Sequence, residues 1–430
     1  MTRKRYIDSP GAAEDFGRAK DFLPGAAVLG DARQSAYDFF TETGLPGPKV
    51  EEWKYSNLTK LAAETFTVAE KVETRIPDLT TFEAVARLVF VNGYFSASQS
   101  TLAEIKGLTL CPLSQAPDDK LALFAGLEDE DSLSALNKAL FTDGYYLEVA
   151  AGTELPGPIE IIYRADASSE NRALRSRNLI ILGEKARADL IETFEGAVDT
   201  GYWTQAVSHI RLAKSSTLKS YSLQQEGNRA VHMNRKSVKL AEKANFENHS
   251  LQIGAELSRT EIFPTLDGEQ ANVTLKGAYL ARKGQSQDIF TRMDHAIGHC
   301  ESEQIFRGVV DKGGKTAFQG KVIVEKDAQK TNADQSCKNL LLDRQAQANA
   351  KPELLIFADD VKCSHGATVG ELDDMALFYL ESRGLAPAEA RALLVEAFLA
   401  EVFEDIDNEQ LRDAFQSRIR TWLAASEVTS

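Results

Sequence analysis

Short apolar runs separated by polar turns dominate the chain from about residue 141 to residue 366. Examples are GPIEIIYRA, RNLIILG, KSVKLAE and ELLIFADD. Runs of this length, rich in β-branched residues and bounded by turn residues, are typical of β-strands. No long helical period interrupts them. The pattern therefore predicts a mainly β core.

Several of these runs resemble one another. The matching pieces begin at Leu182, Leu212, Leu240, Leu266 and Leu342, and the first four are spaced 30, 28 and 26 residues apart. A strand-turn-strand unit that recurs roughly every 20–30 residues is typical of a β-solenoid. A β-sandwich with chance similarity between its turns is the alternative, but sandwich strands usually recur about every 8–12 residues. We therefore expect a β-helix core over residues 141–366.

Both ends of the chain differ from this core. The pattern of residues 1–140 predicts a helical or α+β region, which includes a helix over residues 31–44 that Gly44 ends. Residues 367–430 predict a helical domain, because apolar residues recur at helical spacing and Pro387 suits a helix start. The apolar positions that we select as a docking face are Leu372, Met375, Tyr379, Leu393, Leu394 and Phe398.

The C-terminal segment is also strongly acidic. Residues 371–430 contain thirteen acidic residues against five arginines, a net charge of −8 within a chain total of −15. Such a segment suits either a docking element for a partner or a cap over the open end of the solenoid. The overall charge argues against binding to nucleic acid or an anionic membrane, since both require clustered Lys and Arg.

Cysteine usage and the first residues bear on the compartment. Four cysteines in 430 residues, with no CxxC pair, do not form a disulfide framework, and this favours a reducing cytoplasm. No apolar run reaches the roughly 20 residues of a membrane helix, and the basic start lacks the apolar core of a secretory signal.

Two short motifs contain residues that bind metals. In an extended strand the side chains of Cys363 and His365 point the same way, roughly 6.5–7 Å apart along the backbone. A thiolate with an imidazole suits zinc, iron or an iron–sulfur cluster, but two ligands do not complete a site. A buried cysteine beside a hydrogen-bonded histidine is the alternative. The second motif, HAIGHC, places His295, His299 and Cys300 together, and a structural role is favoured there because no fourth ligand is near.

The stretch KPELLIFADDVKCSHGATVGELDDMALFYLESRGL (351–385) resembles the C-terminal signature of the SufB/SufD family. Those proteins are scaffolds of the Suf machinery that assembles iron–sulfur clusters. GLPGPKVEEWKYSNL (44–58) and DAQKTNADQSCKNLLL (327–342) also match, in the family's order. The KCSH form of the motif is similar to the SufD branch rather than to SufB.

This resemblance implies a right-handed parallel β-helix with helical ends and a non-catalytic role in a cytoplasmic heteromer. The implied partners are SufB, which would pair with the last β-helix strands, and the ATPase SufC, which would dock on the C-terminal helices and alone use ATP. A transient iron–sulfur cluster would form at the SufB interface, with His365 as the main ligand and Cys363 beside it. Reduced flavin is associated with the complex. A homodimer that uses the same edge is a further alternative for the chain alone.

A different function class also fits the fold. Stand-alone β-helix enzymes act on extended polymers such as polysaccharides, and they place carboxylates or basic residues in a solvent-exposed groove. Co-purification with an ATPase and a SufB-like chain distinguishes the scaffold from such an enzyme.

Overall fold

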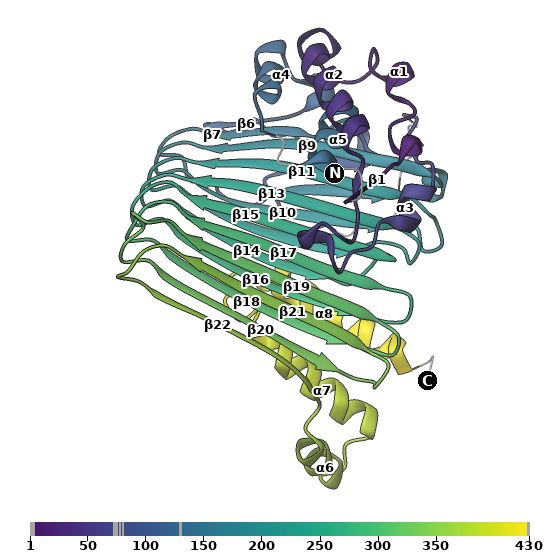
Figure 1. Ribbon diagram of the computed structural model, residues 1–430, viewed down its shortest axis with the longest axis vertical. Coiled ribbons are helices and arrows are strands. Elements are labelled where there is room, and N and C mark those ends of the chain that lie inside the picture. The colour runs from purple at the N-terminus through teal and green to yellow at the C-terminus, as the bar shows by residue number, and fades with distance from the viewer. Residues whose placement is uncertain (1–4, 72–75, 77–78, 80, 129–130, 428–430) are drawn as a thin grey trace.

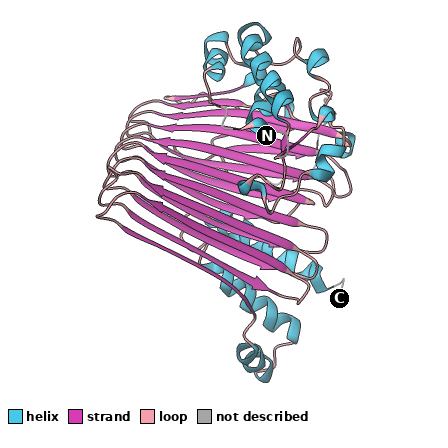
Figure 2. Cartoon of the chain, viewed as in Figure 1, coloured by secondary structure: helices cyan, strands magenta, loops and turns pink. Residues whose placement is uncertain are grey.

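The computed structural model describes residues 5–71, 76, 79, 81–128 and 131–427. Its centre is a parallel β-solenoid of about eight turns, built from two long sheets that face each other (Figure 1). Helices gather at the N-terminal end and beside the C-terminal end (Figure 2). The mainly β solenoid with helical ends that the sequence predicted is therefore confirmed, and the β-sandwich alternative is wrong.

Each turn of the solenoid contributes one strand to each sheet. The sheet that ends at β22, here the β22 sheet, contains β5 (Tyr94–Phe95), β4 (Ala86–Val91), β8 (Ile159–Ala165), β10 (Arg187–Gly196), β12 (Thr217–Gln225), β14 (Asn245–Gln252), β16 (Asn272–Ala281), β18 (Glu301–Val310), β20 (Asn332–Leu341) and β22 (Lys362–Glu371). The β21 sheet contains β6 (Leu108–Pro112), β7 (Tyr145–Val149), β9 (Arg172–Leu182), β11 (Trp203–Leu212), β13 (Val231–Leu240), β15 (Leu257–Leu266), β17 (Ser286–His295), β19 (Lys315–Val324) and β21 (Gln347–Ile356), and β3 (Thr67–Val68) pairs with β9. Only the β4–β5 and β6–β7 pairs within these sheets are antiparallel among the strands described.

The leucines that marked the sequence repeat stack directly on one another. Register pairs join Leu182 to Leu212, Leu212 to Leu240 and Leu240 to Leu266, and all four are buried in the main core. Leu342 is the exception, because it follows β20 and so belongs to a turn after the other sheet. The space between the sheets, here called the lumen, is thus filled by side chains and forms the hydrophobic core.

Helices and short strands at the N-terminus cover the first turns of the solenoid. These are β1 (Tyr6–Ile7), α1 (Phe16–Ala19), α2 (Ala26–Thr43), β2 (Leu45–Pro46), α3 (Thr59–Ala63), α4 (Asp118–Ala125) and α5 (Ser132–Leu140). Helix α2 ends before Gly44 as predicted, where φ is +82°, but it begins five residues earlier than the predicted start. Strands β4 and β6 belong to the solenoid sheets, so strand pairing begins within the predicted 1–140 region.

The C-terminal region has three helices, α6 (Asp374–Ser382), α7 (Pro387–Ala400) and α8 (Glu409–Glu427). Apolar side chains of α7, α8 and the segment between them pack on the outer face of the β22 sheet. Ion pairs join the same surfaces, including Arg307 to Glu401 at 2.6 Å and Lys219 to Asp407 at 2.7 Å. No helix in the described part of the chain combines the length and apolar character needed to cross a membrane.

Candidate functional site

Cys363 and His365 lie on β22, the last strand of the β22 sheet. Cys363 pairs with Ala333 on β20, and His365 pairs with Gln335. Ala333 and Gln335 are buried and Cys363 packs against the main core, so this row of positions faces the lumen. Ser364 points outward, where its hydroxyl donates to a carboxylate on β20. The alternation of the strand therefore places both candidate ligands on the lumenal face.

The two candidate ligands differ in their exposure. Cys363 is half-buried and His365 is exposed, because β22 has a paired strand on one side only. Burial raises the pKa of the Cys363 thiol, and a backbone hydrogen bond involving Ala333 offsets part of that rise. The thiol therefore keeps its proton at neutral pH in this chain alone, and metal binding must displace it.

The chain does not complete a metal site around this pair. Among the residues that the structure describes, no group of three or more His, Cys, Asp and Glu side chains is placed to hold a metal ion. Cys337 is one turn away, where it pairs with Ala367, but it is buried with its Sγ atom 3.3 Å from Tyr279 Oη. Burial also raises the pKa of Cys337. Cys337 is thus a core residue, and the pair supplies two ligands where tetrahedral sites take four.

The end of the solenoid around this pair is an open edge. Strands β21 and β22 each end their sheet, and parallel pairing leaves a row of backbone N–H and C=O groups on their outer sides. Apolar side chains are exposed beside that edge, including Leu355, Phe357 and Val369, with Phe357 61% exposed. An unpaired edge with exposed apolar side chains is suited to pairing with strands of another chain.

A groove of about 640 Å³ runs beside Cys363 on the outer side of the β22 sheet. Its lining includes the carboxylates of Glu301, Glu303 and Asp334, together with Lys362. Carboxylates outnumber cations in this lining, so the outer surface of the sheet beside this strand is acidic and favours cations over anions.

The predicted docking residues separate into two groups. Leu372 and Phe398 pack against the C-terminal core, and Leu394 is half-buried. Met375, Tyr379 and Leu393 are exposed, with Met375 74% exposed. The exposed group lies on α6, which has no buried residue, and on α7, so apolar side chains face solvent on both helices.

Phe378 was missed by the sequence analysis, although it is 67% exposed on α6. The helical spacing selected one apolar face as a docking face, and Phe378 lies outside the i, i+3, i+4 positions of that face. Helix α6 projects from the solenoid beyond β22 (Figure 1), so apolar residues around more than one face remain in solvent. The signal that was available is the run MALFYL, which is apolar all round.

The HAIGHC motif does not assemble a metal site in the structure. His295 is buried at the end of β17, and its Nε2 atom lies 2.9 Å from Ser302 Oγ. His299 is exposed in the following turn, with φ of +60°, while Cys300 is buried and donates to the carbonyl oxygen of Gly268. The three side chains point to different environments. The structural role favoured from the sequence agrees with this placement.

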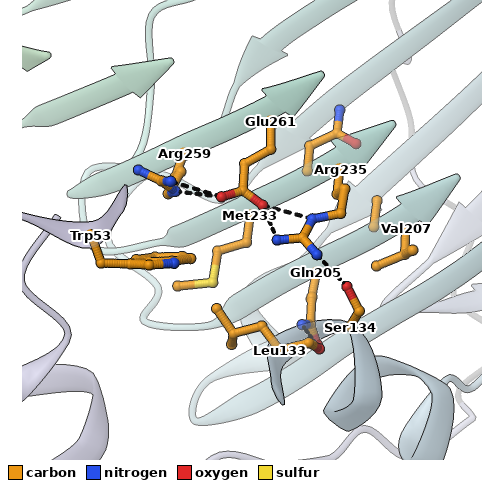
Figure 3. Close-up of a pocket in the computed structure, with 11 residues that line it drawn as sticks. Trp53, Leu133, Ser134, Gln205, Val207, Met233, Arg235, Arg259 and Glu261 are labelled. Carbon is orange, nitrogen blue, oxygen red and sulfur yellow. Dashed lines mark hydrogen bonds and ion pairs between the residues drawn. The ribbon is translucent and has the colours of Figure 1, made fainter. Parts of the chain in front are cut away.

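Residues of the EEWKYSNL motif pack the N-terminal segment against the outer face of the β21 sheet. Trp53 covers a small pocket in which the guanidinium of Arg259 lies 4.0 Å from the centre of its ring system (Figure 3). Arg259 also donates to Glu261 at 2.8 Å and pairs with Asp288. The hydroxyl of Ser56 hydrogen-bonds Asp288, so the segment is attached on both sides of Trp53.

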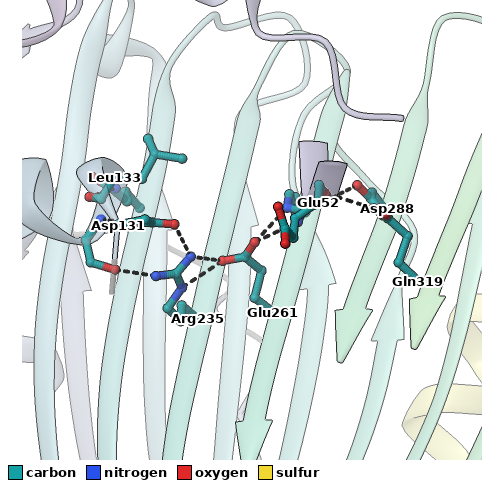
Figure 4. A network of polar contacts seen from close by, with 10 residues as sticks. Glu52, Asp131, Leu133, Arg235, Glu261, Asp288 and Gln319 are labelled. Atoms are coloured by element: carbon teal, nitrogen blue, oxygen red, sulfur yellow. Dashed lines mark hydrogen bonds and ion pairs between the residues drawn. The ribbon is translucent and has the colours of Figure 1, made fainter. Parts of the chain in front are cut away.

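A continuous polar network extends from this contact to α5. Arg235 bridges Glu261 and Asp131, and it also donates to Ser134 Oγ at 2.5 Å (Figure 4). Further along, the amide of Gln319 donates to the carbonyl oxygen of Glu52 at 2.9 Å. The network is therefore a structural connection between the N-terminal region and the solenoid. The same segment also reaches β21, where Lys351 pairs with Glu51 at 2.5 Å.

Comparison with known families agrees with this architecture. A family model described as "SUF system FeS cluster assembly, SufBD core domain" matches residues 163–398. The chain belongs to the SufB/SufD family. A second model, the SufBD protein N-terminal region, matches residues 18–161. The core match extends from within β8 through every later strand of the solenoid to most of α7, so the Cys363/His365 strand lies inside it.

Similar proteins cover different shares of the chain. The chain is 31% identical over 382 residues to the iron-sulfur cluster assembly protein SufD of Escherichia coli, covering 88% of this chain and 89% of that protein. It is 30% identical over 421 residues to a SufBD family protein of Synechocystis, covering 94% and 92%. With SufB of Bacillus subtilis it shares 27% identity over 271 residues, 63% and 58% of the two chains. The family places the chain in iron–sulfur cluster assembly.

Proposed function

We propose that the chain is a non-catalytic scaffold subunit on which a nascent iron–sulfur cluster is assembled as cargo. His365 and Cys363 supply two ligands from the lumenal face of β22, and a partner supplies the others. One observation carries the proposal. The two ligands lie on the terminal strand of the β22 sheet, whose outer edge has no paired strand, so a second chain that extends the sheets would close the site around them.

The proposed partner at this edge is a SufB-like chain. A protein named SufB shares 271 aligned residues with this chain, so a related solenoid would present the same strand spacing. Pairing it against β21 and β22 would satisfy the backbone groups of the edge and cover Phe357 and Val369. The same edge would pair with a second copy of this chain when the partner is absent, which gives the homodimer.

The proposed partner at the other surface is a SufC-type ATPase. The exposed apolar residues of α6 and the acidic character of the C-terminal segment support docking there. ATP hydrolysis belongs to that partner. We assign reduced flavin to the assembled complex and to no residue of this chain.

The experiment replaces His365 with alanine and follows complex formation and cluster build-up in cells that depend on this system. We expect the His365→Ala complex to form at the normal stoichiometry and to build no cluster. Lys362→Ala is the matched control, since Lys362 lies on the same strand but is exposed on the outer side. Normal cluster build-up in His365→Ala would overturn the site. Purification without any ATPase or SufB-like chain, together with activity on a polysaccharide, would favour the stand-alone enzyme instead.

A further inference from the structure

Gln335 lies on β20 directly between Gln304 on β18 and His365 on β22. Its side chain is in the lumen, and the residue is only 1% exposed. Neither its amide nitrogen nor its amide oxygen has a hydrogen-bond partner among the residues described. A buried amide without hydrogen bonds destabilises a fold, so one kept in a native core requires a physical explanation.

In the preceding turn the equivalent glutamine, Gln304, has a partner for its amide oxygen, while its amide nitrogen has none among the described residues. There the hydroxyl of Thr291 donates across the lumen to Gln304 Oε1 at 2.7 Å. One turn further, Gln304 is replaced by Gln335 and Thr291 is replaced by Gly320 in the same register. Glycine has no hydroxyl to donate. The cross-lumen bond of one turn is therefore absent from the next.

Because Gly320 has no side chain, it also provides the space that the Gln335 side chain occupies. A Cβ atom built on Gly320 would overlap the Gln335 amide, so that side chain reaches across the lumen to the facing strand. On the open side of the turn, the neighbour of Gln335 is His365, because side chains of paired residues stack about 4.8 Å apart in a parallel sheet. Gln335 is thus buried in the lumen on the core side, and its neighbour in the next strand on the open side is His365.

Histidines that bind metals need a partner for their second ring nitrogen. They almost always donate that N–H to a carboxylate, a carbonyl oxygen or water, and this bond fixes the tautomer and the orientation of the ring. The amide oxygen of Gln335 is a carbonyl acceptor on the residue that pairs with His365 in the sheet register. Among the described residues it has no other partner.

We propose that Gln335 is a positioning residue for His365. When a partner strand covers β22, Gln335 Oε1 accepts the hydrogen bond of the lumenal ring N–H of His365, and the other ring nitrogen faces the nascent cluster. The inference depends on the proposed function, because it concerns the same site. It adds a residue that acts through His365 and does not itself touch the cluster.

The test uses the complete complex with Gln335→Met, which removes both polar atoms at similar volume, and Gln335→Glu, which keeps an acceptor oxygen. We expect cluster build-up on the purified complex to fall about tenfold or more in Gln335→Met and to be largely restored in Gln335→Glu. The melting temperature of the isolated Gln335→Met chain should equal or exceed that of the isolated wild-type chain, because there the substitution removes an unpartnered amide.

The matched control is Gln304→Met, one turn deeper. It removes a bond that is made and leaves the buried Thr291 hydroxyl without its partner, so we expect a lower melting temperature and unchanged build-up per assembled complex. A second perturbation, Gly320→Ala, displaces the Gln335 amide and should reduce build-up as Gln335→Met does.

The outcomes separate the two proposals. Normal build-up in Gln335→Met, or equal losses in Gln335→Met and Gln335→Glu, would overturn the positioning role while His365→Ala remains inactive. Normal build-up in His365→Ala would overturn the proposed function itself. A loss in Gln335→Met that accompanies a lower melting temperature and poor complex assembly would also count against positioning, because it indicates a structural role.

Discussion

His295 occupies a leucine position in the core, and its burial makes the stability of the fold depend on pH. In the column that contains Leu240 and Leu266, the next paired residue is His295. The side chain is fully buried, with Nε2 2.9 Å from Ser302 Oγ and no hydrogen-bond partner at Nδ1 among the described residues. Burial lowers the pKa of His295 to about 4. The folded chain therefore holds this imidazole neutral well below its ordinary titration range.

The substitution His295→Leu restores the side chain type of the column and removes the titration. In the unfolded chain a histidine has a pKa of about 6.5, so lowering the pH below that value protonates the unfolded state while the folded state stays neutral. Stability from this residue is therefore present above pH 6.5 and is lost as the pH falls toward 4. At pH 5.5 the unfolded state is favoured about tenfold by this proton, which is about 1.4 kcal/mol.

The measurement is urea unfolding of wild type and His295→Leu at pH 7.5 and pH 5.5. We expect the free energy of unfolding of the variant, relative to wild type, to rise by about 1.4 kcal/mol between the two pH values. At pH 7.5 the variant loses the bond to Ser302, a cost of about 1 kcal/mol. His299→Asn controls for removal of an exposed histidine, and asparagine tolerates the positive φ of that turn. An unchanged difference between variant and wild type at the two pH values would refute the reasoning.

Three further predictions concern the network, a glycine turn and α6. Arg259→Met leaves the buried carboxylate of Asp288 without its ion pair, and we expect urea titration to show a loss of about 3–5 kcal/mol; a loss below about 1 kcal/mol would contradict this. Gly144→Ala should lower stability by about 1–3 kcal/mol in thermal melts, because φ is +141° and a Cβ would overlap the carbonyl oxygen of Arg177; an unchanged melting temperature would show that the turn relaxes. Phe378→Ser should leave the melting temperature unchanged and weaken binding of a SufC-type ATPase about tenfold in calorimetry, or about 1.4 kcal/mol; unchanged affinity would place the docking surface elsewhere.

The sequence predicted the two candidate ligands of the site but not the residue that lies beside them. Strand alternation alone places Cys363 and His365 on one face, and the structure shows that this face is the lumen. Gln335 could not be found in the same way. Its relation to His365 depends on the register between strands about 30 residues apart, and the loss of its partner depends on Gly320 in the opposite sheet. Neither relation is encoded in local spacing.

The docking surface shows the same limit. Helical spacing gave the helices α6 and α7 and the apolar positions on them. It did not distinguish Leu372 and Phe398, which pack on the solenoid, from Met375 and Tyr379, which stay in solvent. That division depends on where each helix lies relative to the β22 sheet. The amphipathic pattern of a helix shows its apolar face but not the surface against which that face packs.

The sequence by itself determined the class of fold, the approximate repeat and the order of the chain's regions. These follow from short-range rules, since the alternation of strands, turn residues at regular spacing and helix ends at glycine and proline all act within a few residues. The tertiary structure decided which residues meet. Stacking of successive turns places His295 in register with the leucine column and pairs Gln335 with His365. It also leaves the outer edge of β22, at the end of its sheet, without a paired strand. Such contacts are set by register and packing between distant segments, because each side chain must fit the turn below it.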